Sequence, residues 1–255
     1  MIEAPKFWFQ KNLSSKILSV LFFPLSLLWI VISLLKKKSI KQYKSKLKVI
    51  CIGNLTVGGT GKTPFAIYTY KLLKELGYKP VFLTRGYGGL LKGPIEVTDR
   101  HDYKKVGDEA LLLNKIGPTI VSKDRSLGAK LIEKHEDNFN VIIMDDGLQN
   151  YQLEQDIKFL LVDKNLKFGN EFCIPAGPLR EPIDQGLIRI DAIVLTGNNN
   201  KDADFNNVHN KTIFNSKVKT IKSPKIKNEK LLAFCGLANS NKFYETLKEN
   251  GFNVT

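Results

Sequence analysis

A glycine-rich loop between an apolar run and the start of a helix constrains the fold of this chain most. Val49–Gly53 is typical of a buried strand, and Gly58-Gly59-Thr60-Gly61-Lys62-Thr63 follows it closely. Such a loop turns backbone N–H groups toward an anion, its Lys reaches terminal phosphates, and its Thr hydroxyl can bind Mg²⁺. Thr56 occupies the first-glycine position of the common pattern, so the motif is the variant G-G-x-G-K-T. The alternative is a glycine-rich turn with a chance Lys-Thr pair, and the flanking strand and helix disfavour it.

The net charge of +14 has an uneven distribution along the 255 residues. Residues 1–48 contain ten lysines and one glutamate, so +9 lies there and +5 in the remainder. Since the excess surrounds an apolar segment and no aromatic-and-basic RNA module is present, the sequence predicts no nucleic-acid partner. The apolar content of 43% indicates a globular protein with one large domain or two small ones.

Cysteine and histidine spacing indicates neither disulfides nor zinc. The three cysteines are dispersed in apolar surroundings without CxxC spacing, at Cys51, Cys173 and Cys235. They are typical of reduced core residues in a cytoplasmic domain. The three histidines also lack any ligand spacing, and a protein zinc site is not expected.

The N-terminal region contains 19 consecutive uncharged residues, Ile17–Leu35, interrupted by Pro24 and followed at once by Lys36-Lys37-Lys38. At helical rise this run just crosses a bilayer core of roughly 30 Å. The lysines suit anionic headgroups on the cytoplasmic face, so we expect a membrane anchor, either a single span or a kinked helix in one leaflet. A signal peptide and a buried core helix are the alternatives. No small-residue cleavage site follows the run.

Strands and helices are predicted to alternate after the glycine-rich loop. The helices are expected at Phe65–Leu76, Ala110–Ile116 and Ser126–His135, and the strands at Val81–Thr84, Thr119–Val121, Val141–Met144, Ile157–Val162 and Ala192–Thr196. This order predicts an α/β fold, a P-loop NTPase-like, mostly parallel sheet flanked by helices.

Several polar residues follow these predicted elements. Asp145 and Asp146 end a buried strand, where parallel sheets bind ligands and where an acid can bind Mg²⁺ beside Thr63. Asp108 and Glu109 precede a helix, where they are either dipole-complementing caps or catalytic acids. The loop Arg85–Gly89 either contacts a phosphate or a sugar or is a plain glycine-rich turn.

The secondary structure and the domain boundary of the C-terminal part, from Gly197 on, are less clear in the sequence. Asn- and Lys-rich residues from Gly197 to about Lys230 predict a loop-rich connection. Leu231–Phe234 is expected as a strand, Asn241–Glu249 as a helix and Phe252–Thr255 as the opening of one more strand. The predicted domains are therefore a membrane-association segment (1–48), a P-loop core (49–225) and the start of a C-terminal α/β lobe (226–255).

Six blocks in order resemble the tetraacyldisaccharide 4′-kinase family, membrane-bound lipid A kinases. They are Gly53–Pro64, Arg85-Gly86-Tyr87, Gly107-Asp108-Glu109, Asp145–Gln149, Gly177–Pro182 and Ala233–Asn239. The resemblance implies transfer of the ATP γ-phosphate to the 4′-hydroxyl of a tetraacyl glucosamine disaccharide 1-phosphate, giving lipid IVA. It also implies ATP and Mg²⁺, and a monomer at the cytoplasmic face of the inner membrane of a Gram-negative bacterium.

The resemblance also implies a role for each matching residue. Asp108 would accept the proton of the sugar hydroxyl, with Lys62 and Asp145 completing the catalytic set and Glu109 as a neighbour. ATP would be bound by Gly58, Gly59, Thr60, Gly61, Lys62 and Thr63. Mg²⁺ would lie near Thr63, Asp146 and Glu181. The sugar and phosphate pocket would be lined by Arg85, Tyr87, Arg125, Gln149 and Arg180.

Members of the family continue to a Phe-Pro-Asp-His-His segment, whose histidine is thought to pair with the Asp that matches Asp108. This sequence stops before that segment, and His101, His135 and His209 lie in other contexts. A fragment or a truncated kinase of impaired activity is therefore expected. The alternative from another functional class is a membrane-tethered P-loop ATPase or switch.

Overall fold

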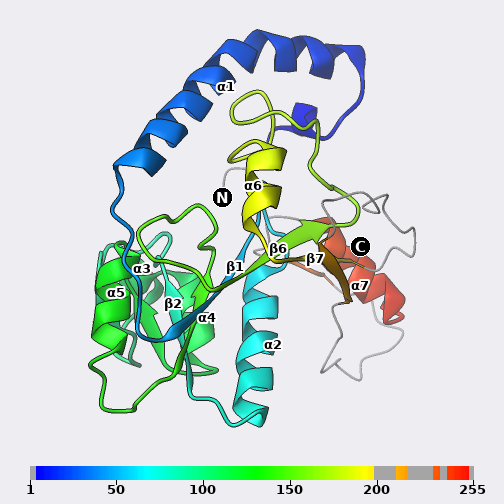
Figure 1. The fold of residues 1–255 in the computed structure, drawn as a ribbon. Coiled ribbons are helices and arrows are strands. Elements are labelled where there is room, and N and C mark those ends of the chain that lie inside the picture. The colour runs from blue at the N-terminus through cyan, green and yellow to red at the C-terminus, as the bar shows by residue number, and fades with distance from the viewer. Residues whose placement is uncertain (1–3, 198–210, 218–231, 236–239, 253–255) are drawn as a thin grey trace.

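An eight-stranded sheet runs through the computed structural model, which describes residues 4–197, 211–217, 232–235 and 240–252 (Figure 1). The strand order is β3-β4-β2-β5-β1-β6-β7-β8. The strands are β1 (Lys48–Gly53), β2 (Pro80–Thr84), β3 (Ile95–Glu96), β4 (Thr119–Val121), β5 (Val141–Asp145), β6 (Ile157–Asp163), β7 (Ala192–Thr196) and β8 (Thr212–Ser216). Neighbouring strands are parallel except β3 and β4. The predicted mostly parallel α/β sheet is confirmed.

Helices cover both faces of the sheet. They are η1 (Lys6–Trp8), α1 (Leu13–Ser39), α2 (Lys62–Glu75), α3 (Tyr103–Val106), α4 (Asp108–Asn114), α5 (Arg125–Ile132), α6 (Ile183–Arg189) and α7 (Ser240–Glu249). Ile52 of β1 packs in one cluster with Ala66 of α2 and Leu113 of α4. The next residue back, Cys51, belongs to a second cluster with residues of α5 and α6. Because successive strand residues face opposite sides, β1 is buried between two helical layers.

The carboxyl ends of the central strands meet at one edge of the sheet. The register pairs Ile52 with Asp145 and Thr84 with Val121. The loops that follow β1, β2, β4 and β5 therefore open on the same side, where doubly wound sheets bind their ligands.

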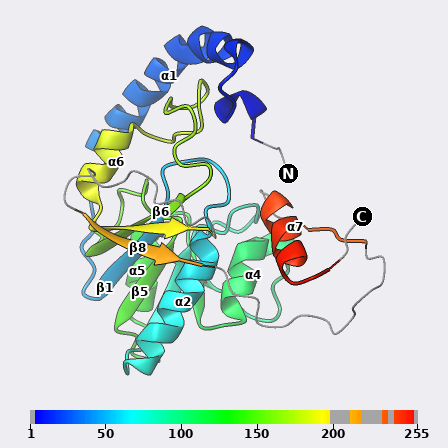
Figure 2. The same ribbon diagram turned by 90° about the vertical axis from the view of Figure 1, so that its right-hand side faces the viewer.

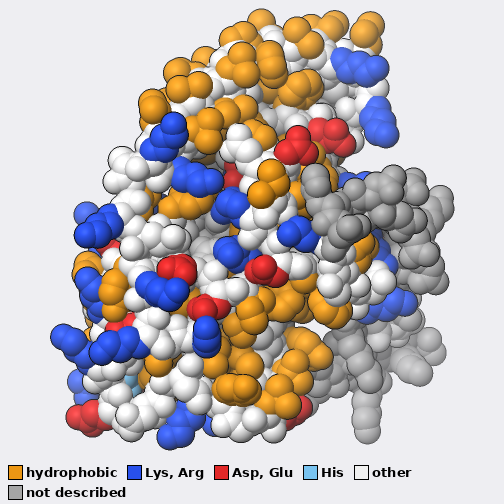
Figure 3. Space-filling view, in the orientation of Figure 1, with side chains coloured by type: hydrophobic (Ala, Val, Ile, Leu, Met, Phe, Trp, Pro, Cys, Tyr) orange, Lys and Arg blue, Asp and Glu red, His pale blue; other side chains and the backbone are white. Residues whose placement is uncertain are grey.

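Helix α1 lies beyond this edge, with α6 between it and the sheet in both views (Figures 1 and 2). The side chain of Asn12 caps the helix by accepting a hydrogen bond from the Ser15 amide at 2.9 Å. Apolar side chains such as Leu21, 68% exposed, cover its outer surface (Figure 3). The small polar residues Ser15, Ser19 and Ser26 are instead buried. The alternative of a buried core helix is therefore wrong.

The structure corrects the C-terminal part of the predicted element order. Thr212–Ser216, expected in a loop-rich connection, forms β8 and pairs with β7 in parallel. The expected strand at Leu231–Phe234 is wrong, since residues 232–235 form none and Leu231 lies outside the described residues. The expected strand from Phe252 depends on residues 253–255, which also lie outside them. The division into 1–48, 49–225 and 226–255 stays a prediction.

Candidate active site

The glycine-rich loop connects β1 to α2 in a conformation that only glycine adopts easily. Gly58 has φ 121° and Gly61 has φ 86°, and Gly61 is the residue directly before α2. Lys62 and Thr63 are therefore the first two residues of the helix, where free N–H groups and the helix dipole favour an anion. The Thr196 hydroxyl donates to the Thr60 carbonyl at 3.0 Å and ties the loop to β7. The loop thus leads into the helix with left-handed glycines, and its binding of phosphate stays a prediction.

Asp145 lies at the carboxyl end of β5, directly beside the loop. The Thr63 hydroxyl donates to Asp145 Oδ2 at 3.1 Å. Burial, followed by the charges of Glu109 and Asp146, raises the pKa of Asp145 to about 7. Its Oδ1 is buried and accepts no hydrogen bond from any described residue. An unpaired buried carboxylate oxygen next to a Thr hydroxyl fits a divalent cation, which would replace the missing partner.

Asp146 adopts a left-handed backbone conformation, with φ 49°. Its Oδ1 lies 2.8 Å from Arg180 Nη1 and 3.6 Å from Lys62 Nζ. Burial works to raise the pKa of Asp146, but these two cations outweigh it and keep the pKa below its usual value. Strained backbone of this kind is held at functional sites by the surrounding contacts. Asp146 is thus an ionised carboxylate between two cations, Lys62 and Arg180.

Glu181, predicted near the metal, lies in a different set of contacts. Its buried carboxylate accepts hydrogen bonds from Arg189 and from Gln149 Nε2, the latter at 3.0 Å. Gln149 Oε1 accepts from Arg180 at 3.2 Å, which links Glu181 to the Asp146 pair through two side chains. Within the described part of the chain, no three His, Cys, Asp or Glu residues form a group that could hold a metal. The structure thus brings Thr63 to Asp145 rather than to Asp146 or Glu181.

The two acids that begin α4 differ in their surroundings. Asp108 is exposed and accepts a hydrogen bond from the Glu109 amide at 3.0 Å. Partial burial and then the charge of Asp146 raise the pKa of Glu109, while Lys62 opposes the shift. Glu109 is therefore electrostatically part of the acidic cluster. The family resemblance implied only a neighbour of the catalytic set at this position.

Of the remaining predicted pocket residues, Arg125 is the most constrained. It begins α5 directly after β4, is 2% exposed, and donates to the Ser122 carbonyl through Nη1. Its Nε has no hydrogen-bond partner among the described residues. Burial and then the nearby Arg85 lower the pKa of Arg125 to about 10. Two arginines this close at the carboxyl edge suit an anionic ligand, whereas Tyr87 is 75% exposed.

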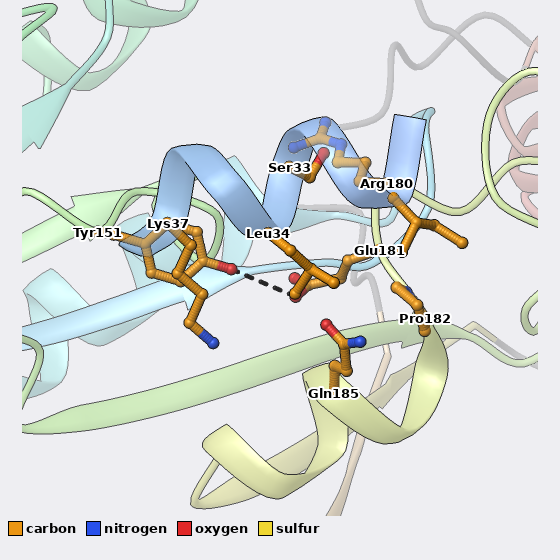
Figure 4. A pocket seen from close by; sticks show the side chains of 9 residues that line it. Ser33, Leu34, Lys37, Tyr151, Arg180, Glu181, Pro182 and Gln185 are labelled. Atoms are coloured by element: carbon orange, nitrogen blue, oxygen red, sulfur yellow. Dashed lines mark hydrogen bonds between the residues drawn. The ribbon is translucent and has the colours of Figure 1, made fainter. Parts of the chain in front are cut away.

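A pocket opens between α1 and α6, and Glu181 is one of the residues that line it (Figure 4). Its lining residues come from both helices and the loops between them, and they are Ile30, Ser33, Leu34, Lys37, Tyr151, Arg180, Glu181, Pro182 and Gln185. The Tyr151 hydroxyl donates to Glu181 at 3.4 Å. The pocket thus connects the apolar helix to the residues around the acidic cluster.

Sequence reasoning missed Tyr151 and Arg189. The Tyr151 ring lies under two cations, Lys37 Nζ and the Arg189 guanidinium carbon, each 5.1 Å from its centroid. Arg189 also pairs with Glu181. No motif marks either residue, and α6, which carries Arg189, was itself not predicted. An arginine in the last turn of a short helix was the only available signal.

Comparison with known proteins agrees with this geometry. Residues 18–255 match the family model described as tetraacyldisaccharide-1-P 4′-kinase. A tetraacyldisaccharide 4′-kinase of Paramagnetospirillum magneticum is 41% identical over all of this chain and 77% of its own length, and one of Allorhizobium ampelinum is 36% identical over 99% and 73%. A crystal structure of LpxK from Aquifex aeolicus, described as an apo form in complex with ATP, superposes with a TM-score of 0.76. It is 30% identical and covers 93% of this chain and 80% of its own. The chain therefore belongs to the tetraacyldisaccharide-1-P 4′-kinase family.

Proposed function

We propose that this chain transfers the γ-phosphoryl group of ATP to the 4′-hydroxyl of a tetraacyl glucosamine disaccharide 1-phosphate, giving lipid IVA in lipid A biosynthesis. Membership of the family supports the substrate and the reaction. The observation that carries the proposal is the contact between Thr63 and Asp145. It joins the phosphate-binding loop to a carboxylate, as phosphoryl transfer with a metal-bound nucleotide requires.

The positions of the residues support the roles that we propose for them. Gly58–Thr63 binds the phosphates of ATP, and Lys62 neutralises the terminal ones. Thr63 and Asp145 would hold Mg²⁺, and Asp146 and Glu181 are the further acids of the predicted set. When bound, Mg²⁺ neutralises phosphate charge.

The acceptor sugar is bound on the opposite side of the acidic cluster. Asp108 accepts the proton of the attacking hydroxyl, and its exposure leaves room for the sugar to approach. Arg180 and Gln149, which bond each other at 3.2 Å, orient the sugar together with Arg85, Tyr87 and Arg125. Phosphoryl transfer needs mainly this positioning and charge neutralisation.

We also propose that α1 lies within one leaflet at the cytoplasmic face of the inner membrane. The helix is long and apolar enough to cross a bilayer. However, Ser26 Oγ donates to the Cys173 carbonyl at 2.7 Å, so one face of the helix stays on the protein. The apolar outer surface then enters the lipid, and Lys36-Lys37-Lys38 in the last turn reach anionic headgroups. Because each buried CH₂ contributes about 0.8 kcal/mol, a tetraacyl substrate stays in the membrane and the enzyme must act there.

The reaction is tested with vesicles that contain the disaccharide 1-phosphate, purified protein and ATP labelled in the γ position. A labelled bis-phosphorylated lipid is expected, and it should be absent with Lys62→Met. Release of free phosphate without a labelled lipid would instead support the ATPase or switch.

A further inference from the structure

Three groups of hydrogen bonds join α1 to the segment 170–180, and we call them the α1 seam. Asn170 Nδ2 donates to Ser19 Oγ at 2.8 Å. Ser26 Oγ donates to the Cys173 carbonyl at 2.7 Å and accepts from the Ala176 amide at 3.1 Å. Trp29 Nε1 donates to the Arg180 carbonyl at 2.9 Å. The seam follows the serine face of a helix whose other side chains are mostly apolar and exposed.

Arg180 accepts the last bond of the seam and donates three more, one of them to Gln149 at 3.2 Å. Its amide donates to the Leu55 carbonyl at 2.7 Å, in the residues that lead into the phosphate-binding loop. Its guanidinium donates to Asp146 Oδ1 at 2.8 Å. One residue thus contacts α1, the phosphate-binding loop and the acidic cluster.

The segment before Arg180 is attached to the same loop. The Val57 amide donates to the Pro178 carbonyl at 2.8 Å, and Thr56 forms a bridge with Leu179. The loop entry therefore rests on the segment to which α1 is bonded. A shift of α1 changes the position of the Arg180 backbone, and with it the guanidinium beside Asp146.

We propose that Trp29 is a positioning residue, which fixes the Arg180 backbone so that docking of α1 at the lipid surface sets the geometry of the phosphoryl-transfer site. This inference rests on the proposed kinase function. Trp29 acts through Arg180 and touches no reacting atom. Trp29 is 41% exposed, so it lies at the border between the protein core and the helix face that we propose enters the lipid.

The test compares Trp29→Phe with Trp8→Phe. Both substitutions remove an indole N–H that bonds a carbonyl of the same segment, since Trp8 Nε1 donates to Pro175 at 3.0 Å. Only the first removes a bond to Arg180. With saturating vesicles that contain the disaccharide 1-phosphate, Trp29→Phe should lower kcat about fivefold and leave KM for ATP unchanged. Trp8→Phe should stay within about twofold of the unsubstituted protein.

Amide hydrogen exchange provides a second readout that needs no activity. The Arg180 amide should exchange faster in Trp29→Phe than in Trp8→Phe, while α2 exchanges equally in both. Equal kcat in the two variants, or equal exchange at Arg180, would overturn the positioning role. If the unsubstituted protein forms no labelled lipid, the kinase proposal fails, and the exchange comparison still decides the role of Trp29.

Discussion

The Thr63 hydroxyl lies 3.1 Å from Asp145 Oδ2, and this contact joins the first turn of α2 to the carboxyl end of β5. The two residues are 82 positions apart in the sequence. They meet because β1 and β5 are parallel neighbours in the sheet, with Ile52 opposite Asp145. The second oxygen of Asp145 has no described hydrogen-bond donor, so the pair presents a hydroxyl and a carboxylate oxygen to one point.

Thr63→Val should lower the affinity for Mg²⁺-ATP by about tenfold, because it removes one oxygen ligand and the group that orients Asp145. Binding of ATP in the presence of a chelator should change little. Titration calorimetry with and without Mg²⁺ measures both quantities. Thr69→Val is the matched control, since the Thr69 hydroxyl bonds the Phe65 carbonyl within α2. An equal loss of metal-free ATP binding would contradict the role of Thr63.

Asp145 should contribute a loss of stability to the free protein as pH rises from about 4 to about 7, because its pKa is raised from 3.8 to about 7. In that range the folded state holds a proton that the unfolded state has released, and linkage then makes unfolding easier at higher pH. Glu109, whose pKa is also raised, acts in the same direction. Urea denaturation at pH 5 and pH 7.5 should show a smaller pH effect for Asp145→Asn. An identical pH effect in both proteins would refute the shift.

Asp108→Asn should reduce kcat by about 10²-fold to 10⁴-fold, the usual contribution of a general base, with little change in ATP affinity. The carboxylate is exposed at the start of α4 and bonds only a neighbouring amide among the described contacts, so folding should be unaffected. Asp184→Asn is the control, because Asp184 is an exposed acid in the first turn of another helix, α6. Unchanged turnover of Asp108→Asn would remove this residue from the mechanism.

Arg189→Gln should destabilise the protein by about 3 kcal/mol, because it leaves the buried carboxylate of Glu181 without its cation. Lys48→Gln should cost less than about 1 kcal/mol, since the pair of Lys48 with Asp156 is at the surface. Chemical denaturation of both variants measures the difference. Equal effects would mean that the Glu181 pair is as weak as a surface one.

Binding to anionic vesicles should depend on the outer face of α1. Asn substitutions at Ile17, Leu21 and Leu28, which are all more than half exposed, should abolish co-sedimentation with the vesicles. The same substitutions at exposed Leu72, Leu76 and Leu112 on α2, its end and α4 should leave it intact. Retained binding of the α1 variant would exclude this face as the contact with lipid.

The central part of the fold and site was predictable because its signals are local. Two apolar runs are clear in the sequence, Val49–Gly53, which ends in glycine, and Val141–Met144, which is followed by two acids. The phosphate-binding loop follows a fixed spacing. The bounds of β7 were predicted to the residue. The α/β class follows from these elements alone.

The rest depends on contacts between distant residues. β8 was missed because Thr212–Ser216 mixes polar and apolar residues and is stabilised by pairing with β7. The sequence places Asp146 and Glu181 in one metal-binding set, but it does not show that each carboxylate forms an ion pair. Asp146 pairs with Arg180, and Glu181 pairs with Arg189. The serines of α1 are few within a run of apolar residues, so they give a weak signal in the sequence. Their role is visible only from their hydrogen bonds to the segment 170–180.

The seam also has a consequence for biosynthesis. The partners of Ser19 and Ser26 lie about 150 residues further along the chain, so α1 leaves the ribosome long before they are made. During that interval its hydroxyls can bond only water or the carbonyls one turn back, as Ser19 does with Ser15 at 2.9 Å. A nascent chain would thus reach the bilayer through α1 first. The sheet would then assemble at the lipid surface, and its loop would close onto a helix that is already in place.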